Sequence, residues 1–154
     1  MGKYFGTDGF RGEANVTLTA KHAFKIGRFL GWYYCSRRND GNRARIVIGK
    51  DTRRSSYMLE YALAAGITSS GADAYLLHVT TTPSVAFVTK HDGFDCGIMI
   101  SASHNPFYDN GIKLLNDQGE KMDDETIARV EEFLDGKSGI PPYAVRDDIG
   151  KTID

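Results

Sequence analysis

The sequence predicts an α/β protein, a three-layer α/β/α sandwich with a mixed, mostly parallel sheet. Short β-branched apolar runs alternate along the chain with segments whose apolar residues recur at helical spacing. Polar loops begin at Gly49, Thr80 and Ser101, each at the end of an expected strand, and open α/β sheets bind ligands at the carboxyl ends of their strands. Asn110-Gly111 favours a tight hairpin turn, which would make one edge strand antiparallel.

The composition is that of one ordinary globular domain. The chain has 154 residues, of which 41% are hydrophobic and 25% charged, and its net charge is −1. This balance argues against a nucleic-acid partner, and no apolar run approaches the roughly 18 residues of a membrane span. The N-terminus lacks the pattern of a signal peptide. Cys35 and Cys96 have no metal-ligand spacing, so we expect free thiols in a reducing, cytoplasmic compartment.

The first helix is expected to begin after the cap residue Thr19 and to run to about Ser36. Its apolar positions follow helical spacing, while basic residues, among them Arg28, mark a solvent-exposed face. The preceding residues 1–17 contain four glycines and no sustained apolar period. That pattern indicates a loop or a short strand.

Two strand–helix pairs follow in the middle of the chain. Each consists of an apolar β-branched run, a polar loop and a helical apolar stripe. Ser55 or Ser56 suits the N-cap of the first of these helices, and Pro83 suits the first turn of the second. The strands are expected at 44–48 and 74–79, and the helices are expected to end near Ser70 and Lys90.

The last part of the chain contains two more strands, a helix and a polar tail. Asp123 is expected to cap the helix, and the tail contains Pro141-Pro142, which is typical of a linker. The strands are expected at 94–100 and 112–116. The expected organisation is a domain over 1–136 and a linker over 137–154 that leads towards a second domain outside this chain.

One polar stretch between two expected strands carries most of the functional signal: Ser101-Ala-Ser-His-Asn-Pro-Phe-Tyr-Asp-Asn-Gly-Ile-Lys113. Polar loops held by a rigid scaffold commonly carry function. Ser103 is followed by His104, but sequence neighbours do not make a catalytic triad. From the loop alone a purely structural turn is supported about equally well, since Asn-Pro and Asn-Gly are turn formers.

Two further segments contain residues suited to phosphate. Tyr4-Phe-Gly-Thr-Asp-Gly-Phe-Arg-Gly12 reads either as a plain turn or as a loop that directs Arg11 to a phosphate, because the planar guanidinium suits phosphate oxygens. Gly49-Lys-Asp-Thr-Arg-Arg-Ser-Ser56 has the strand–loop–helix order of a phosphate loop. The Walker spacing fails there, because it requires glycine where Ala44 stands.

Together these segments resemble the α-D-phosphohexomutases. Ser-His-Asn-Pro followed by Asp-Asn-Gly-Ile-Lys is similar to the phosphoserine loop of that family, and the segment from Tyr4 to Gly12 is similar to the start of its phosphoglucosamine mutase branch. The Gly49–Ser56 segment resembles a sequence near the family's cleft. The resemblance runs from about Lys3 to about Gly136.

The resemblance implies an isomerase that interconverts glucosamine 6-phosphate and glucosamine 1-phosphate, a step toward amino-sugar precursors of the cell wall. Ser103 would carry the phosphoryl group, Lys113 would act as the general base, and Arg11 would steady phosphate charge. His104 and Asn105 would hold the loop and contact the ligand. The implied catalytic residues are Ser103, Lys113, Arg11 and His104, and the implied substrate and phosphate ligands are Asn105, Thr7 and Asp8.

The resemblance covers only the first, phosphoserine-bearing domain of enzymes with four domains. Mg²⁺ would bind through the phosphate on Ser103, with its remaining ligands in the second domain, and glucosamine 1,6-bisphosphate would be the activating intermediate. The implied partners are the hexosamine phosphate substrate and the remaining three domains. We therefore expect the isolated chain to be inactive.

Two alternative functions remain open from the sequence. The first is a sibling mutase that acts on glucose or mannose phosphates, because sugar selection lies in the other domains of the family. The second is a free-standing binding or regulatory module without catalysis. A serine hydrolase fits poorly, since the chain has no Gly-x-Ser-x-Gly elbow.

Overall fold

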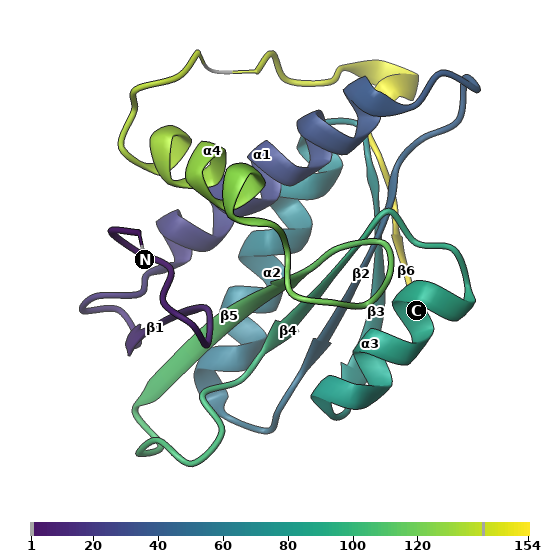
Figure 1. The fold of residues 1–154 in the computed structure, drawn as a ribbon. Coiled ribbons are helices and arrows are strands. Elements are labelled where there is room, and N and C mark those ends of the chain that lie inside the picture. Colours follow the sequence, from purple (N-terminus) through teal and green to yellow (C-terminus); the bar gives the residue numbers. More distant parts are fainter. Residues whose placement is uncertain (1, 140) are drawn as a thin grey trace.

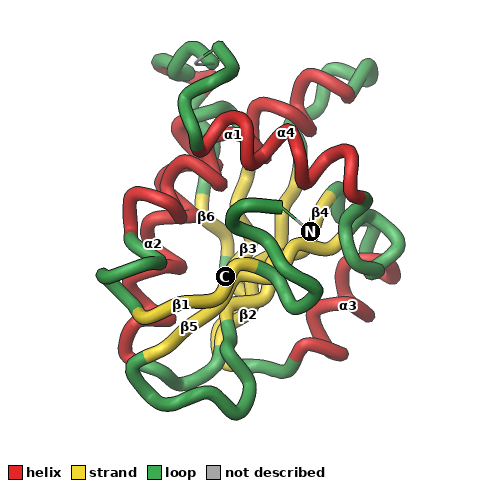
Figure 2. Tube along the Cα trace, turned by 60° about the vertical axis from the view of Figure 1, so that its left-hand side comes forward, coloured by secondary structure: helices red, strands yellow, loops and turns green. Residues whose placement is uncertain are grey.

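The computed structural model describes residues 2–139 and 141–154 and contains a three-layer α/β/α sandwich (Figure 1), as the sequence predicts. Helices α1, α2 and α4 cover one face of the sheet, and α3 covers the other (Figures 1 and 2). In chain order the elements are β1 Phe10–Glu13, α1 Ala20–Arg37, β2 Arg45–Lys50, α2 Arg54–Ser69, β3 Asp73–Val79, α3 Thr82–His91, β4 Cys96–Ile100, β5 Asp109–Leu115, α4 Asp124–Leu134, the 3₁₀ turn η1 Arg146–Asp148 and β6 Thr152–Ile153.

The sheet has six strands in the order β1-β5-β4-β2-β3-β6. The pairs β4–β2, β2–β3 and β3–β6 are parallel, whereas β5 is antiparallel to both of its neighbours. The carboxyl ends of β2, β3 and β4 therefore lie at one edge of the sheet, together with the start of β5. This edge is where the sequence predicts the functional loops.

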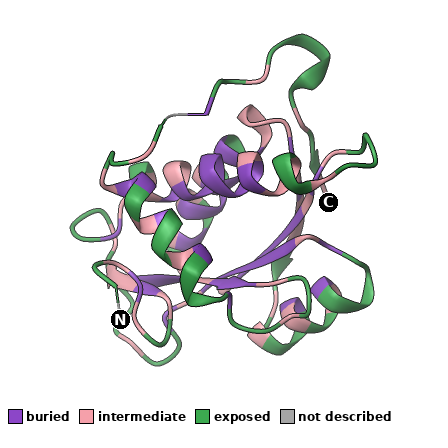
Figure 3. Ribbon diagram, turned by 45° about the horizontal axis from the view of Figure 1, so that its top comes forward, coloured by how far each residue is buried: buried purple, intermediate pink, exposed green. Residues whose placement is uncertain are grey.

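Two hydrophobic cores, one on each face, hold the layers together. The larger core packs α1, α2 and α4 against side chains such as Ile46, Ile98 and Ile112, and the smaller core packs α3 against Val47 and Met99. Alternate residues of a strand face opposite sides of a sheet, so the fully apolar run of β4 serves both cores. Figure 3 shows that buried residues gather in the sheet and on the helix sides that face it.

The helix caps agree with most of the sequence predictions. Thr19 caps α1 through its side chain, Asp123 caps α4, and Pro83 lies in the first turn of α3. The prediction that Ser55 or Ser56 caps α2 is wrong. The N-cap residue is Arg53, and its side chain makes no capping hydrogen bond. Both serines instead bond to side chains near the edge of the sheet.

Asn110-Gly111 is not a hairpin turn, which corrects a second prediction. Both residues lie within β5, opposite Gly12 and Arg11 of β1, so β1 rather than β5 is the edge strand. The Asn110 side chain is fully buried, donates to Ser55 and Ser56, and accepts from the Gly111 amide. A Cβ at Gly111 would lie 2.6 Å from the Ser101 carbonyl oxygen, so close backbone packing requires glycine there.

The polar tail returns to the domain, whereas its composition predicts a linker. Residues 152–153 pair with β3 as the sixth strand (yellow in Figure 1). Arg28, placed by the sequence on an exposed face, is only 2% exposed, bonds to the carbonyls of Pro141 and Pro142, and lies 3.9 Å from the Tyr143 ring centre. The tail therefore buries a helix side that a free domain would leave in water. The boundary at 136 stays a prediction.

Helices α1 and α2 approach each other closely at glycines. A Cβ at Gly66 would lie 2.2 Å from the Phe24 carbonyl oxygen and 2.7 Å from the Arg28 amide nitrogen. Gly27, on the facing helix, is equally confined, since its Cβ would lie 2.4 Å from the Leu63 carbonyl oxygen. The two helix backbones are in contact at this crossing, so no methyl group fits between them.

We predict that Gly66→Ala lowers the free energy of unfolding by about 1–3 kcal/mol, because the added methyl group must separate α1 from α2. The clash outweighs the roughly 1 kcal/mol by which alanine favours a helix over glycine. Urea unfolding measures the change. Gly139→Ala is the control, since a Cβ there meets open space. A Gly66→Ala variant as stable as the wild type would contradict the close crossing.

Candidate active site

The candidate site lies where β4 ends and β5 begins, in the serine loop (residues 101–108). Ser103 is exposed, and its φ of 53° is in the left-handed region that non-glycine residues rarely adopt. The Ser103 amide donates to the Ser101 hydroxyl at 3.1 Å, and the Asn105 amide donates to the Ala102 carbonyl at 3.0 Å. The loop thus presents the Ser103 hydroxyl to solvent on a tightly turned and strained backbone.

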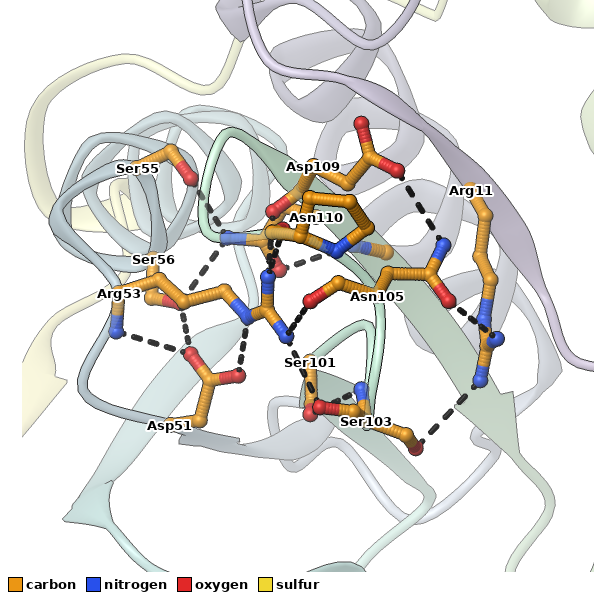
Figure 4. Close-up of polar contacts among 12 residues, drawn as sticks. Arg11, Asp51, Arg53, Ser55, Ser56, Ser101, Ser103, Asn105, Asp109 and Asn110 are labelled. Atoms are coloured by element: carbon orange, nitrogen blue, oxygen red, sulfur yellow. Dashed lines mark hydrogen bonds and ion pairs between the residues drawn. The ribbon is translucent and has the colours of Figure 1, made fainter.

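Arg11 reaches the serine loop from the edge strand β1. Its two terminal nitrogens lie 3.4 Å from the Ser103 hydroxyl and 3.4 Å from the Asn105 side-chain oxygen (Figure 4). Its Nε is buried and has no hydrogen-bond partner within residues 2–139 and 141–154. Both contacts are long, so the guanidinium retains donor capacity directed at the serine. A planar cation in this position suits an anionic group on Ser103 better than the neutral hydroxyl.

Arg53, to which sequence reasoning assigned no role, lies behind the loop (Figure 4). Its guanidinium donates to four main-chain carbonyl oxygens, at distances of 2.5–3.0 Å, and its Nε donates to Asp51 at 2.9 Å. The four carbonyl groups belong to Ser103, Asn105, Pro106 and Asp109. The sequence signal was the Asp-Thr-Arg run after a strand, which does not by itself reveal main-chain partners.

Asp51 fixes Arg53 in turn and is itself held by hydrogen bonds. Burial would raise the pKa of Asp51, but hydrogen bonds from the Ser56 hydroxyl and from the backbone and side chain of Arg53 outweigh it and lower the pKa below its usual range. The carboxylate is therefore ionised at neutral pH and pairs with the Arg53 guanidinium.

Lys50, from the same segment, does not face the site. Its side chain is 1% exposed and pairs with the buried Glu60 of α2 at 3.0 Å. The pair links the end of β2 to the helix that packs on it. Removal of either partner alone would leave an uncompensated buried charge.

Thr7 and Asp8, which the resemblance implies as ligands, line a cavity together with Lys113. This cavity of about 590 Å³ lies between the N-terminal segment, β5 and α4, and Phe5 and Leu115 are also among the residues that line it. Lys113 lies two residues beyond Gly111 on β5 and so shares its face of the sheet, the face on which Arg11 packs. The fold thus assembles these residues around one strand.

The structure brings the predicted residues together in two sets. Ser103, Arg11 and Asn105 are joined by hydrogen bonds, and Thr7, Asp8 and Lys113 share the cavity. His104 is exposed and makes no side-chain hydrogen bond to the others among the residues described here. The catalytic and binding roles of all seven remain predictions.

Comparison with known proteins identifies the family. The family described as phosphoglucomutase/phosphomannomutase, alpha/beta/alpha domain I, matches residues 2–139. The chain belongs to this family. The resemblance found in the sequence is thereby confirmed.

Two similar proteins are phosphoglucosamine mutases. The chain is 71% identical over 154 residues to the phosphoglucosamine mutase of Lachnospira eligens and 62% identical to that of Lachnoclostridium phytofermentans, covering 100% of this chain and 34% of each relative. A crystal structure of a phosphoglucomutase/phosphomannomutase family protein from Burkholderia thailandensis superposes with a TM-score of 0.76 at 25% identity, covering 97% of this chain and 32% of that one. The chain thus spans about a third of these relatives' length.

The described residues contain neither a metal-binding cluster nor a membrane-spanning helix. Within the described ranges no group of three or more His, Cys, Asp or Glu side chains could hold a metal ion. The helices described here include none that is both long and apolar enough to cross a membrane. Any metal bound at Ser103 would therefore need most of its ligands from elsewhere.

We predict that Asp51→Asn lowers the free energy of unfolding at pH 7 by about 1.5–3 kcal/mol, the range for hydrogen bonds to a charged group. The pKa of Asp51 is depressed in the folded state, so its contribution is complete above its unfolded pKa and is lost as pH falls through the folded value. The difference between variant and wild type should therefore shrink below about pH 4. Unfolding at several pH values measures this.

Asp117→Asn is the matched control for that experiment. Asp117 is exposed in a turn and makes no side-chain hydrogen bond with the described residues, so its replacement should change stability by less than about 0.5 kcal/mol at every pH. If the Asp51→Asn difference persisted unchanged at pH 2, the carboxylate would not be the stabilising species.

Proposed function

We propose that this chain is the phosphoserine domain of a phosphoglucosamine mutase, which interconverts glucosamine 6-phosphate and glucosamine 1-phosphate. The observation that carries the proposal is the 71% identity, over the whole chain, to a protein of that name. The placement of Arg11 beside the Ser103 hydroxyl supports it, because a phosphate on that serine would meet a cation that has donors to spare.

In the proposed reaction Ser103 carries a phosphoryl group and transfers it to a hydroxyl of the sugar monophosphate. The bond between phosphorus and the serine oxygen breaks as the bond to the sugar oxygen forms, and a bisphosphate results. Lys113 takes the proton of the attacking hydroxyl. After the sugar turns round, its other phosphate returns to Ser103, and the isomer leaves. Phosphoryl transfer depends mainly on alignment and on neutralised charge, which Arg11 and the rigid loop supply.

The remaining predicted residues would bind the sugar phosphate. Asn105 keeps its side-chain oxygen on Arg11 and its nitrogen 3.3 Å from Asp109, so it orients the cation toward the phosphate. Thr7 and Asp8 would contact the ligand from the cavity wall. His104 is free to contact it from the exposed side of the loop.

Magnesium is proposed to bind at Ser103 only in a longer protein. Mg²⁺ requires about six oxygen ligands, and the described residues offer only the phosphate on Ser103 without a carboxylate cluster beside it. When bound, the ion would neutralise charge on the transferred phosphate. The remaining ligands, the sugar-reading groups and the grip on the second phosphate are proposed to come from three further domains, in keeping with the 34% coverage of the relatives.

Two companion proposals concern the substrate and the compartment. A glucose or mannose phosphate is the alternative substrate, and the family description supports it. Glucosamine phosphate is the better supported substrate, because the relatives with 71% and 62% identity are phosphoglucosamine mutases. The reducing cytoplasm, where amino-sugar phosphates would be made for the cell wall, is the proposed location and agrees with the free thiols of Cys35 and Cys96.

We predict that mass spectrometry of the full-length protein, treated with glucosamine 1,6-bisphosphate, finds phosphate on Ser103. Ser103→Ala should lower mutase turnover by more than about 1,000-fold, because the covalent carrier is lost. Ser36→Ala, at the far end of α1, is the control and should turn over like the wild type. Unchanged turnover in Ser103→Ala would exclude the phosphoserine route.

We further predict that this 154-residue chain by itself, given Mg²⁺ and glucosamine 1,6-bisphosphate, forms no glucosamine 1-phosphate at a steady rate. The reason is the lack of a carboxylate cluster for the metal within the described residues. A coupled assay for the product measures this, with the full-length protein as the positive control. Sustained turnover by the chain alone would contradict the proposal that three further domains are required, and it would favour a free-standing enzyme.

A further inference from the structure

The serine loop has few contacts of its own that could hold its shape. Its side chains are mostly exposed, with Phe107 85% exposed, and it contributes only Ala102 to the hydrophobic core. Within the loop the amides of Ser103 and Asn105 make short-range hydrogen bonds. Such turns open readily by themselves, so a contact from outside the loop must select its conformation.

Arg53 supplies that contact with every donor it has. A guanidinium has five N–H groups, and here the five acceptors are one carboxylate oxygen of Asp51 and the carbonyl oxygens of Ser103, Asn105, Pro106 and Asp109. The side chain is 12% exposed, so these bonds are largely shielded from water. They reach from the serine itself to the first residue of β5 and therefore hold this part of the loop, whose two ends are bonded to Gly111 and to Ala14.

The two arginines at this site are used differently. Arg11 makes two long contacts of 3.4 Å and has a buried Nε without a partner in the described part of the chain. Arg53 is saturated by oxygen atoms that already belong to the protein. Arg11 can therefore donate hydrogen bonds to a phosphate, whereas Arg53 has no donor left for a phosphate unless it releases the loop.

The residues that hold Arg53 are themselves fixed by hydrogen bonds. Arg53 occupies the N-cap position of α2, and Asp51, which accepts from its backbone and side chain, is bonded to the buried Ser56 at 2.5 Å. Ser56 also accepts from the fully buried Asn110 of β5. The loop is thus tied through Arg53 to a helix and a strand that are themselves packed in the core.

We propose that Arg53 is a positioning residue for Ser103: it holds the serine in its left-handed conformation facing Arg11 and does not touch the transferred phosphate. This inference deepens the proposed function and rests on it. The carbonyl of Ser103 is one of the four that Arg53 binds, so release of the guanidinium allows the strained φ of 53° to relax and the hydroxyl to turn away.

The test compares Arg53→Lys and Arg53→Ala with Arg54→Lys and Arg54→Ala in the full-length protein. Arg54 is the next residue on α2, is exposed, and makes no hydrogen bond from its side chain to the described residues. Lysine keeps the charge but has neither the planar fork nor five donors, so it cannot replace the arginine. Steady-state mutase kinetics, hydrogen exchange of backbone amides and thermal unfolding are measured on each variant.

We expect both Arg53 variants to lose about 10–100-fold in kcat, the cost of misplacing a reacting group by about 1 Å, with KM within about 2-fold of the wild type. The amides of Ser103, Asn105 and Asp109 should exchange at least about 10-fold faster, while those of β2 and β4 stay protected. Both Arg54 variants should match the wild type in all three measurements.

Three results would overturn the inference. The first is wild-type kcat and KM in Arg53→Ala. The second is a raised KM at unchanged kcat, which would make Arg53 a substrate ligand. The third is independent of catalysis: unchanged exchange of the loop amides in Arg53→Ala would mean that Arg53 does not hold the loop. If the wild type neither turned over nor carried phosphate on Ser103, the proposed function would fail, and the exchange data would still decide whether Arg53 holds the loop.

Discussion

The hydrogen bonds between the Arg53 guanidinium and the serine loop determine the geometry of the candidate site. A loop of exposed polar residues has no hydrophobic reason to keep one shape, and Ser103 has a backbone conformation that is unfavourable for a non-glycine residue. Four carbonyl oxygens aligned on one planar cation supply the missing constraint. They also leave the side of the loop that faces Arg11 open for a ligand.

The reversed strand β5 gives that arrangement its scaffold. It lies between β4 and β1, so it places the end of the serine loop beside Arg11 and continues to Lys113 on the same face. Buried Asn110 and close-packed Gly111 fix this strand where its backbone meets β1 and the loop. The site is therefore carried by regular structure at both ends, which gives a short catalytic loop precision that it could not achieve alone.

Arginine side chains bind main-chain carbonyls at several places among the described residues, and three of these contacts hold polar segments. Arg53 holds the serine loop, Arg28 holds the Pro141-Pro142 segment, and Arg43 binds the carbonyls of Gly71, Asp147 and Asp148. In each case a mostly polar segment is fixed by a cation whose backbone belongs to the sandwich. This explains how a polar tail can return to add a sixth strand.

The sequence by itself determined the fold class, the order of the elements from α1 to α4, most helix caps and the family, because apolar periodicity, cap residues and the serine motif are local signals. Only the tertiary structure decided that Asn110-Gly111 lies within a strand, that Arg28 is buried under the tail, and that Arg53 binds the loop. The physical reason is common to all three. Each depends on main-chain groups more than 40 residues away in the chain: the backbone of β1 for Asn110-Gly111, the Pro142 carbonyl for Arg28 and the Asn105 carbonyl for Arg53. Such groups are present at every residue, so no sequence pattern marks which of them a strand or an arginine will meet.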